Sequence, residues 1–281
     1  MHIIKHHTGP RFHCNAPLSY LDALRFAGFD GFVLSNNHNA DCGYEGILDT
    51  VNNLNDQSFM HTGLFRNEKD PRVLIVEVNG IRLGLLSYTE HINRRMDEEI
   101  LTPLGRSVML NQFSEEKLKA DVAEARKRGA EFLICYIHFL GNDYSHDVHP
   151  NNVKTAKLIA ESGVDCVMGS HMHAVQRYER LRTSDGRSVP LIYSLGNFIS
   201  SETKDIAKQS VVYMLSLEKK DGKVLIADER YVPCFVLEGY ARSTFTVYPL
   251  RKITKTDEAS LKLQAAKEEI VQNIGALSPM E

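Results

Sequence analysis

The stretch VDCVMGSHMH, residues 164–173, shows the pattern on which the fold prediction rests. An apolar run of strand length ends at Gly169 and Ser170, and two histidines follow at once. The pattern recurs, so that three more apolar runs end in polar residues: FVLSNNH (32–38), FLICYIHF (132–139) and YSLGNF (193–198). In layered α/β folds the loops after the carboxyl ends of strands converge on the ligand. We therefore predict an α/β fold in which these four strand ends meet in one cleft.

Outward from these strands, the sequence alternates between helical and extended patterns, as expected of layered α/β folds. Asn79-Gly80 and Asp221-Gly222 each join two apolar runs and predict tight hairpin turns. Ser114 is a predicted N-cap. Helices are predicted at 19–28, at about 44–54, at 114–128, up to Ser162, and at 257–274. The helix at about 44–54 has an apolar stripe of Ile47, Leu48, Val51 and Leu54. The helix at 257–274 has an apolar face of Leu261, Ala265 and Ile270.

Composition indicates an ordinary globular protein. The chain has 281 residues and a net charge of -3, and we predict a single domain over 1–281, with its core at about 12–250 and a carboxyl-terminal helical segment at 251–281. The charge gives no signature for binding nucleic acid. The five scattered cysteines lack metal or disulfide spacing and are expected to be small buried hydrophobic residues. With no membrane segment and no signal-peptide pattern, the chain as given is predicted to be cytoplasmic.

The His-Met-His unit at 171–173 is the strongest indication of a metal site. Side chains two residues apart in an extended segment point to the same side, so His171 and His173 are predicted to place two imidazoles around one ion. The alternative is a pair of hydrogen-bonded loop histidines, and the other strand-end clusters make it less favoured. His138, alone at the end of a strand, is a candidate ligand only because of these neighbours.

The turn SNNHNAD, residues 35–41, also admits two interpretations. In the functional one, Asn37 is a metal ligand through its amide oxygen, His38 is a general acid or oxyanion contact, and Asp41 orients the imidazole. In the structural one, Asn39 and Asp41 are turn residues and Asp41 caps the helix that begins near Gly43. Both interpretations of Asp41 are compatible.

The signatures SNNHNADCG, IHFLGNDY, GVDCVMGSHMH and IYSLGNFI, in this order and with an Asn-Gly hairpin after the first, resemble the CapA group of bacterial poly-γ-glutamate capsule synthesis proteins. That group belongs to the calcineurin-like metallophosphatase superfamily, and the resemblance covers roughly residues 12 to 200. It implies a four-layer α/β/β/α sandwich with a dinuclear metal centre. By the same resemblance, one ion is held by Asn37, His138 and His171, and its neighbour is bound by His173.

The resemblance also implies a function. His38 would contact the phosphoryl or leaving group, and a metal-held hydroxide would attack in line. The ligand types suit Mn, Fe or Zn. The expected substrate is a small molecule or a polymer that is either a phosphoester or related to polyglutamate. The protein would then be a phosphoesterase-type hydrolase or a component of capsule polymer synthesis. The alternative is a degenerate, non-catalytic binding protein that keeps the fold. Family members can be exported or membrane-anchored.

One departure from the family pattern is the absence of the early strand-end carboxylates that complete the metal pair. The first one or two strands are expected to be missing, which would leave a sheet edge uncovered and favour a homodimer or a poorly soluble monomer. Three explanations remain open: a chain that starts late, a degenerate member that binds one ion or none, or recruitment of other groups. Candidate groups are His6, His7 and His13 and, with better support, Asp143, His146, Asp147 and His149, for which a solvated polar loop is the alternative.

Overall fold

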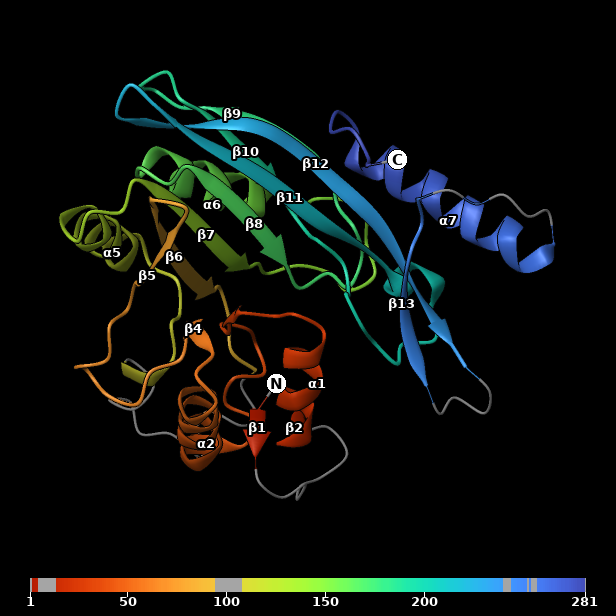
Figure 1. Ribbon diagram of the computed structural model, residues 1–281, viewed down its shortest axis with the longest axis horizontal. Helices are drawn as coiled ribbons and strands as arrows, with labels where there is room; N and C mark the ends of the chain where they lie inside the picture. Colours follow the sequence, from red (N-terminus) through yellow and green to blue (C-terminus); the bar gives the residue numbers. More distant parts are fainter. Residues whose placement is uncertain are drawn as a thin grey trace. The chain divides into compact units, whose positions relative to one another are not determined.

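The computed structural model describes residues 2–4, 14–93, 108–239, 244–251, 253 and 257–280 (Figure 1). The chain divides into two compact units, Met1–His138 and Phe139–Glu281, and each is presented by itself. The single-domain organisation therefore stays a prediction. No helix in the described part of the chain has the length and apolar character needed to cross a membrane.

The first unit alternates strands and helices, and its strands belong to three sheets. Strands β1 and β2 pair in parallel, as do β3 and β4. In the third sheet β6 pairs antiparallel with β5 and parallel with β7, which sets Thr89 opposite His138. The elements are β1 (His2–Ile4), β2 (Asn15–Pro17), α1 (Ser19–Phe26), β3 (Gly31–Val33), α2 (Gly43–Asp56), β4 (Met60–Thr62), β5 (Leu74–Val78), β6 (Ile81–Thr89), α5 (Glu115–Lys127) and β7 (Phe132–His138).

The local signals of the first unit are confirmed. Asn79 and Gly80 form the turn between β5 and β6 with φ angles of 50° and 78°, the left-handed pair that a two-residue hairpin requires. The Ser114 side chain accepts a hydrogen bond of 3.2 Å from the backbone N–H of Lys117 and caps α5. On α2 the predicted stripe faces the core, with Ile47, Val51 and Leu54 buried and Leu48 packed against the buried cluster.

The strands of the second unit belong to two sheets. Strand β10 lies between β8, its parallel neighbour, and β9, its antiparallel neighbour, while β11, β12 and β13 form an antiparallel sheet. The predicted turn at Asp221-Gly222 joins β11 to β12. The elements are α6 (Pro150–Glu161), β8 (Cys166–Ser170), β9 (Tyr178–Arg182), β10 (Ser188–Ile192), the 3-10 helix η1 (Asp205–Lys208), β11 (Gln209–Lys220), β12 (Lys223–Glu238), β13 (Phe245–Pro249) and α7 (Glu258–Ile274).

Helix α7 has the predicted length but a different buried face. It lies along β11 and β12 (Figure 1), where Ala266, Ile270 and Ile274 join a core cluster with Tyr231. Only Ile270 of the predicted face is buried, whereas Leu261 is 55% exposed and Ala265 is exposed as well. The prediction for Leu261 and Ala265 was wrong because the chosen stripe is rotated from the face that meets the sheet.

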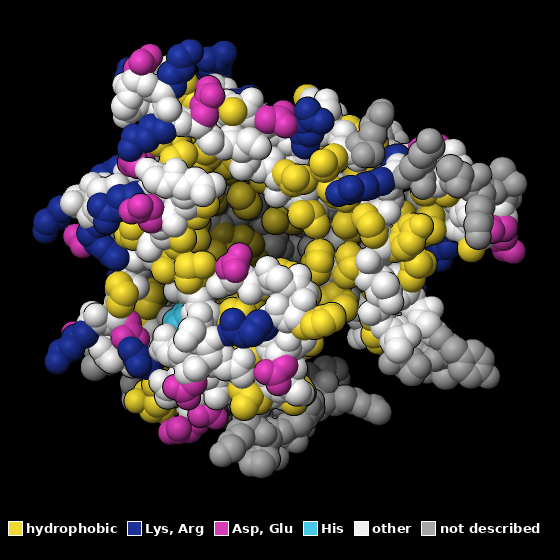
Figure 2. Space-filling model, viewed as in Figure 1, with side chains coloured by type: hydrophobic (Ala, Val, Ile, Leu, Met, Phe, Trp, Pro, Cys, Tyr) yellow, Lys and Arg dark blue, Asp and Glu magenta, His cyan; other side chains and the backbone are white. Residues whose placement is uncertain are grey.

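The second unit leaves apolar side chains exposed on its long hairpin. Val212 and Met214 on β11 and Leu225 and Leu237 on β12 are partly accessible. Figure 2 shows apolar side chains gathered over these strands. Nothing in the described residues bears on the homodimer, which stays a prediction.

Candidate metal centre

The turn after β3 is folded by its own asparagine side chains. Asn39 is buried; its Nδ2 donates to the Leu34 carbonyl at 2.9 Å, and its Oδ1 accepts from the backbone N–H of Asn36 at 2.6 Å. Asn36 Oδ1 in turn accepts from the backbone N–H of His38 at 2.8 Å. Asn39 is therefore the turn residue that the structural interpretation expected. These bonds hold the backbone that presents Asn37 and His38.

Asn37 and His138 face each other in the first unit, although 101 residues separate them in sequence. His138 is the last residue of β7, and its Nε2 lies 3.0 Å from Asn37 Oδ1. Asn37 Nδ2 donates to Asn93 Oδ1 at 3.1 Å, and the Asn93 backbone N–H donates to the Asn37 carbonyl at 2.9 Å. The amide oxygen is thereby directed at the imidazole, in the orientation that both a hydrogen bond and shared coordination of an ion require.

Asp41 contacts His38 and is not the N-cap residue of α2. His38 Nδ1 lies 2.8 Å from Asp41 Oδ2, an oxygen that also accepts from the backbone N–H of Cys14 at 3.0 Å. The N-cap position of α2 is Cys42, without a side-chain cap bond, so the capping interpretation of Asp41 was wrong. The hydrogen bond to Asp41, followed by one to Cys14, raises the pKa of His38 to about 9, while burial opposes the shift.

His171 and His173 come together in the second unit by a route that the sequence did not indicate. Their ring centroids are 6.5 Å apart. The segment after β8 is not extended, because His171 has a φ of 110° and His173 a φ of 54°. The extended geometry predicted for His-Met-His was therefore wrong, although the two rings do lie near each other. His173 Nδ1 donates to Asn197 Oδ1 at 2.9 Å, and Asn197 Nδ2 donates to the Ala207 carbonyl at 3.0 Å.

The four residues considered as replacement ligands all lie in the loop between β7 and α6, and their surroundings differ. His146 contacts the Val175 carbonyl and Glu269 Oε1, and His149 caps α6 by accepting from the backbone N–H of Asn151. The carboxylate of Asp147 is exposed. Asp143 differs, since its Oδ1 lies 3.8 Å from His171 Nε2. His6, His7 and His13 lie outside the described residues.

Sequence reasoning missed three contributors to these clusters. Asn93 and Cys14 hold the turn that carries Asn37 and His38, and the Tyr144 ring stacks on His173 with centroids 5.7 Å apart. Cys14 is exposed and Cys42 is half-buried, so the expectation that all cysteines are buried was wrong for these two. Cys14, His38 and Asp41 have donor atoms within 4.8 Å of one another. For Cys14 no sequence signal existed, because a single cysteine without paired spacing carries little information.

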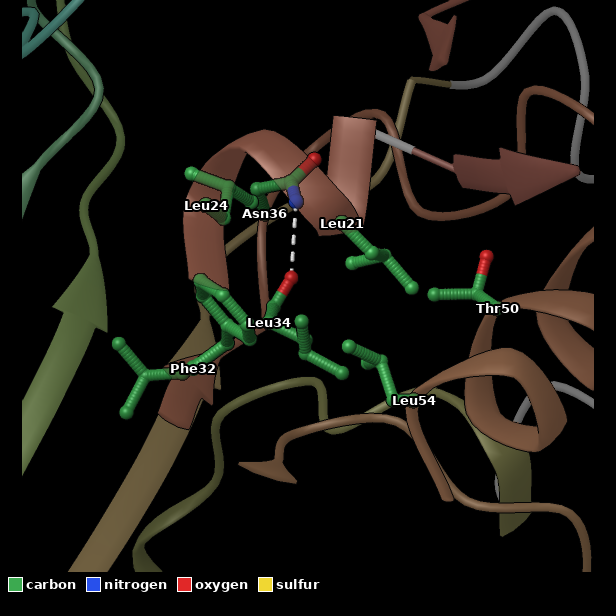
Figure 3. Close-up of a pocket in the computed structure, with 8 residues that line it drawn as sticks. Leu21, Leu24, Phe32, Leu34, Asn36, Thr50 and Leu54 are labelled. Carbon is green, nitrogen blue, oxygen red and sulfur yellow. Dashed lines mark hydrogen bonds between the residues drawn. The ribbon is translucent and has the colours of Figure 1, made fainter. Parts of the chain in front are cut away.

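A separate apolar pocket lies behind the same turn (Figure 3). Its volume is about 150 Å³, and the Asn36 side chain donates to the Leu34 carbonyl at its wall. The described lining residues include none of the predicted ligands; they are Leu21, Leu24, Phe32, Val33, Leu34, Asn36, Thr50 and Leu54. We therefore place the candidate chemistry at the histidines and not in this pocket.

The chain has a mixed α/β fold, which confirms the predicted fold class. The chain is similar to the structure of NAD nucleotidase (NadN) from Haemophilus influenzae, with a TM-score of 0.52, 12% identity, and coverage of 92% of this chain and 49% of that one. At this identity the similarity concerns the fold alone.

Family membership follows from sequence comparison. The family model described as bacterial capsule synthesis protein PGA_cap matches residues 4–202, and the chain belongs to that family. It is 26% identical over 232 residues to the capsule biosynthesis protein CapA of Bacillus anthracis, covering 81% of this chain and 53% of the relative. It is 22% identical over 202 residues to the PGA biosynthesis protein CapA of Bacillus subtilis (strain 168), covering 70% and 49%. The chain thus spans about half the length of these curated relatives.

Proposed function

We propose that this protein is a metal-dependent, phosphoesterase-type hydrolase that acts in the synthesis of a capsule polymer. The observation that carries the proposal is the pairing of Asn37 Oδ1 with His138 Nε2 at 3.0 Å, next to the His38–Asp41 pair at 2.8 Å. Two potential ligands, Asn37 on the turn after β3 and His138 at the end of β7, beside an oriented acid–base imidazole are what hydrolysis at a metal ion needs.

The proposed ligands are Asn37 and His138 in the first unit and His171 and His173 in the second. The donor chemistry fits a divalent ion, because imidazole nitrogens and an amide oxygen suit Mn, Fe or Zn. A partner on the far nitrogen of a ligating histidine fixes the ring, and Asn197 holds His173 Nδ1 in this way. A bound ion would supply a water of lowered pKa and charge stabilisation. That the four strand ends share one cleft stays a prediction.

His38 is proposed as the general acid and Asp41 as the residue that positions it. The Asp41 carboxylate receives the Nδ1–H of His38, which leaves Nε2 as the atom to deliver a proton to a leaving group. Because the hydrogen bond with Asp41 favours the protonated imidazole, His38 is suited to donate rather than accept. Asn93 Nδ2 lies 3.4 Å from His38 Nδ1, so Asn93 is a neighbour of the imidazole on the side that faces Asp41.

The substrate is proposed to be a small molecule or polymer that carries a phosphoester or is related to polyglutamate. Support comes from the family and from the names of the two relatives, a capsule biosynthesis protein and a PGA biosynthesis protein. Simple phosphodiesters and phosphomonoesters, together with γ-glutamyl oligomers, form a substrate panel that distinguishes these classes.

Metal content and hydrolysis measured together test the proposal. The purified chain is stripped with a chelator, loaded with Mn, Fe or Zn, and assayed for bound metal by mass spectrometry and for turnover of the panel. We expect bound metal and phosphoester turnover in the wild type, with both reduced in His138→Ala and His171→Ala. His149→Asn is the matched control, since Asn retains an N-cap function. If the chain binds well under one ion, and if neither alanine substitution changes metal content or turnover, the protein is instead the non-catalytic binding protein.

A further inference from the structure

Asp143 and His171 lie at a separation that two ligands of one ion can have. Asp143 Oδ1 and His171 Nε2 are 3.8 Å apart, which is too long for a hydrogen bond. With ligand bonds of about 2.1 Å, two donors on one ion lie about 3.4 Å apart at the tetrahedral angle and at most about 4.2 Å apart. We propose that Asp143 is a metal ligand beside His171 and supplies a carboxylate to the proposed metal centre. This inference rests on the proposed metal centre.

The residue after Asp143 ties the loop to the His-Met-His turn. The Tyr144 backbone N–H donates to the carbonyl of Met172, the residue between the two histidines, at 2.7 Å. Its ring stacks on His173 at an interplanar angle of 26°. Asp143 and Tyr144 therefore lie beside one histidine each, and the backbone next to Asp143 is bonded to the His-Met-His turn.

The remainder of the loop is anchored independently of any ion. The buried side chain of Gln176 donates through Nε2 to the carbonyls of Ser145 and Asp147, at 3.0 and 2.7 Å. His146 Nδ1 lies 2.7 Å from the Val175 carbonyl. A backbone held at these points keeps Asp143 in place before metal binds, so less conformational entropy is lost on binding.

Charge gives a reason why a carboxylate belongs here. His171 and His173, the ligands proposed in the second unit, are both neutral when they coordinate a metal. A divalent cation bound by neutral groups alone keeps its full charge, and a carboxylate lowers that charge and strengthens binding electrostatically. Asp143 is about half exposed and His171 is largely buried, so the pair offers an ion a solvent-accessible approach on the carboxylate side.

The test measures metal affinity directly. The full chain and the variants Asp143→Asn, Asp147→Asn and His171→Ala are stripped and titrated with Zn²⁺ against a chromophoric chelator, and Co²⁺ absorption reports the ligand field. We expect Asp143→Asn to weaken Zn²⁺ binding by at least the ~10-fold typical of residues that merely support a ligand, and to change the Co²⁺ bands. Asp147→Asn, an exposed carboxylate of the same loop, is expected to bind as the wild type.

The outcomes separate this inference from the function on which it rests. If the wild type binds Zn²⁺, His171→Ala weakens binding and Asp143→Asn does not, Asp143 is only a surface ion-pair partner and the inference is overturned while the metal centre stands. If the wild type binds no divalent ion, the metal centre and the role of Asp143 are both overturned. Thermal unfolding of Asp143→Asn at the wild-type temperature excludes misfolding as a cause.

Discussion

Replacing Tyr88 with Phe removes a single buried hydrogen bond from the sheet that ends at His138. Tyr88 on β6 is 0% exposed and Asp121 on α5 is 6% exposed, and the Tyr88 hydroxyl donates to Asp121 Oδ2 at 2.7 Å. Phenylalanine keeps the edge-to-face contact with Phe113, at 5.8 Å between centroids. Hydrogen bonds to charged groups contribute about 1.5–3 kcal/mol, so we expect the substitution to lower the free energy of unfolding by about 2 kcal/mol at neutral pH.

The loss is expected to depend on pH. Burial raises the pKa of Asp121 above its ordinary value of 3.8, and the hydrogen bond from Tyr88 opposes that rise. The folded chain therefore binds this proton more tightly than the unfolded chain, and stability falls as pH rises from 3.8 through the folded-state pKa. Tyr88→Phe removes the hydrogen bond that opposes the rise, so the folded-state pKa of Asp121 lies higher in this variant. The loss of stability with rising pH therefore continues to a higher pH. The destabilisation is thus larger at pH 7 than at pH 4.

Urea unfolding followed by circular dichroism at both pH values measures this difference. Asp121→Asn serves as the matched background, because an asparagine accepts the same hydrogen bond without a charge to titrate. In that background Tyr88→Phe is expected to cost about 1 kcal/mol at either pH. Equal losses at pH 4 and pH 7 in the wild-type background, or a loss at pH 7 below about 0.5 kcal/mol, would refute the reasoning.

Three further predictions concern the cap, a glycine and the proposed acid. Ser114→Ala is expected to cost about 1 kcal/mol in urea unfolding because α5 loses its N-cap, with Ser114→Asp retaining most of the stability. Gly196→Ala is expected to cost at least about 2 kcal/mol in the same assay. The φ of Gly196 is 73°, and the added Cβ would lie 2.3 Å from the Gln209 carbonyl oxygen. A near-neutral result would contradict this steric argument. Asp41→Asn is expected to lower phosphoester turnover by about 10²–10⁴-fold with metal content unchanged, and unchanged turnover argues against His38 as the acid.

The sequence predicted the elements well where local chemistry decides the structure. Asn79-Gly80 and Asp221-Gly222 determine hairpins because few other dipeptides adopt two successive left-handed conformations. Ser114 determines a helix start because its hydroxyl satisfies a backbone N–H that the helix leaves unpaired. The buried face of α7 was not predicted, because several apolar stripes exist on that helix and only the sheet beneath it selects one.

Sequence reasoning selected residues of the candidate site but not the contacts that join them. Asn37 with His138 and His38 with Asp41 were singled out by type and position, and each pair is in contact. The Asn93 link between them depends on a loop contact across 56 residues, which no local pattern encodes. For the same reason, sequence alone could not separate Asp143 from His146, which is engaged by a carbonyl and a glutamate.

Positive φ angles at non-glycine residues mark where the backbone of the second unit departs from the conformations that such residues prefer. Of the six non-glycine residues with positive φ in the described chain, Asn79 and Asp221 form hairpin turns and Ser58 follows a helix. The other three are Tyr144, His171 and His173. The Tyr144 backbone bonds to Met172, between the two histidines, and the Tyr144 ring stacks on His173. Such conformations cost about 1–3 kcal/mol each and persist where surrounding contacts impose them, most often at functional sites. Their concentration around the two histidines therefore favours a site that needs both imidazoles held in place.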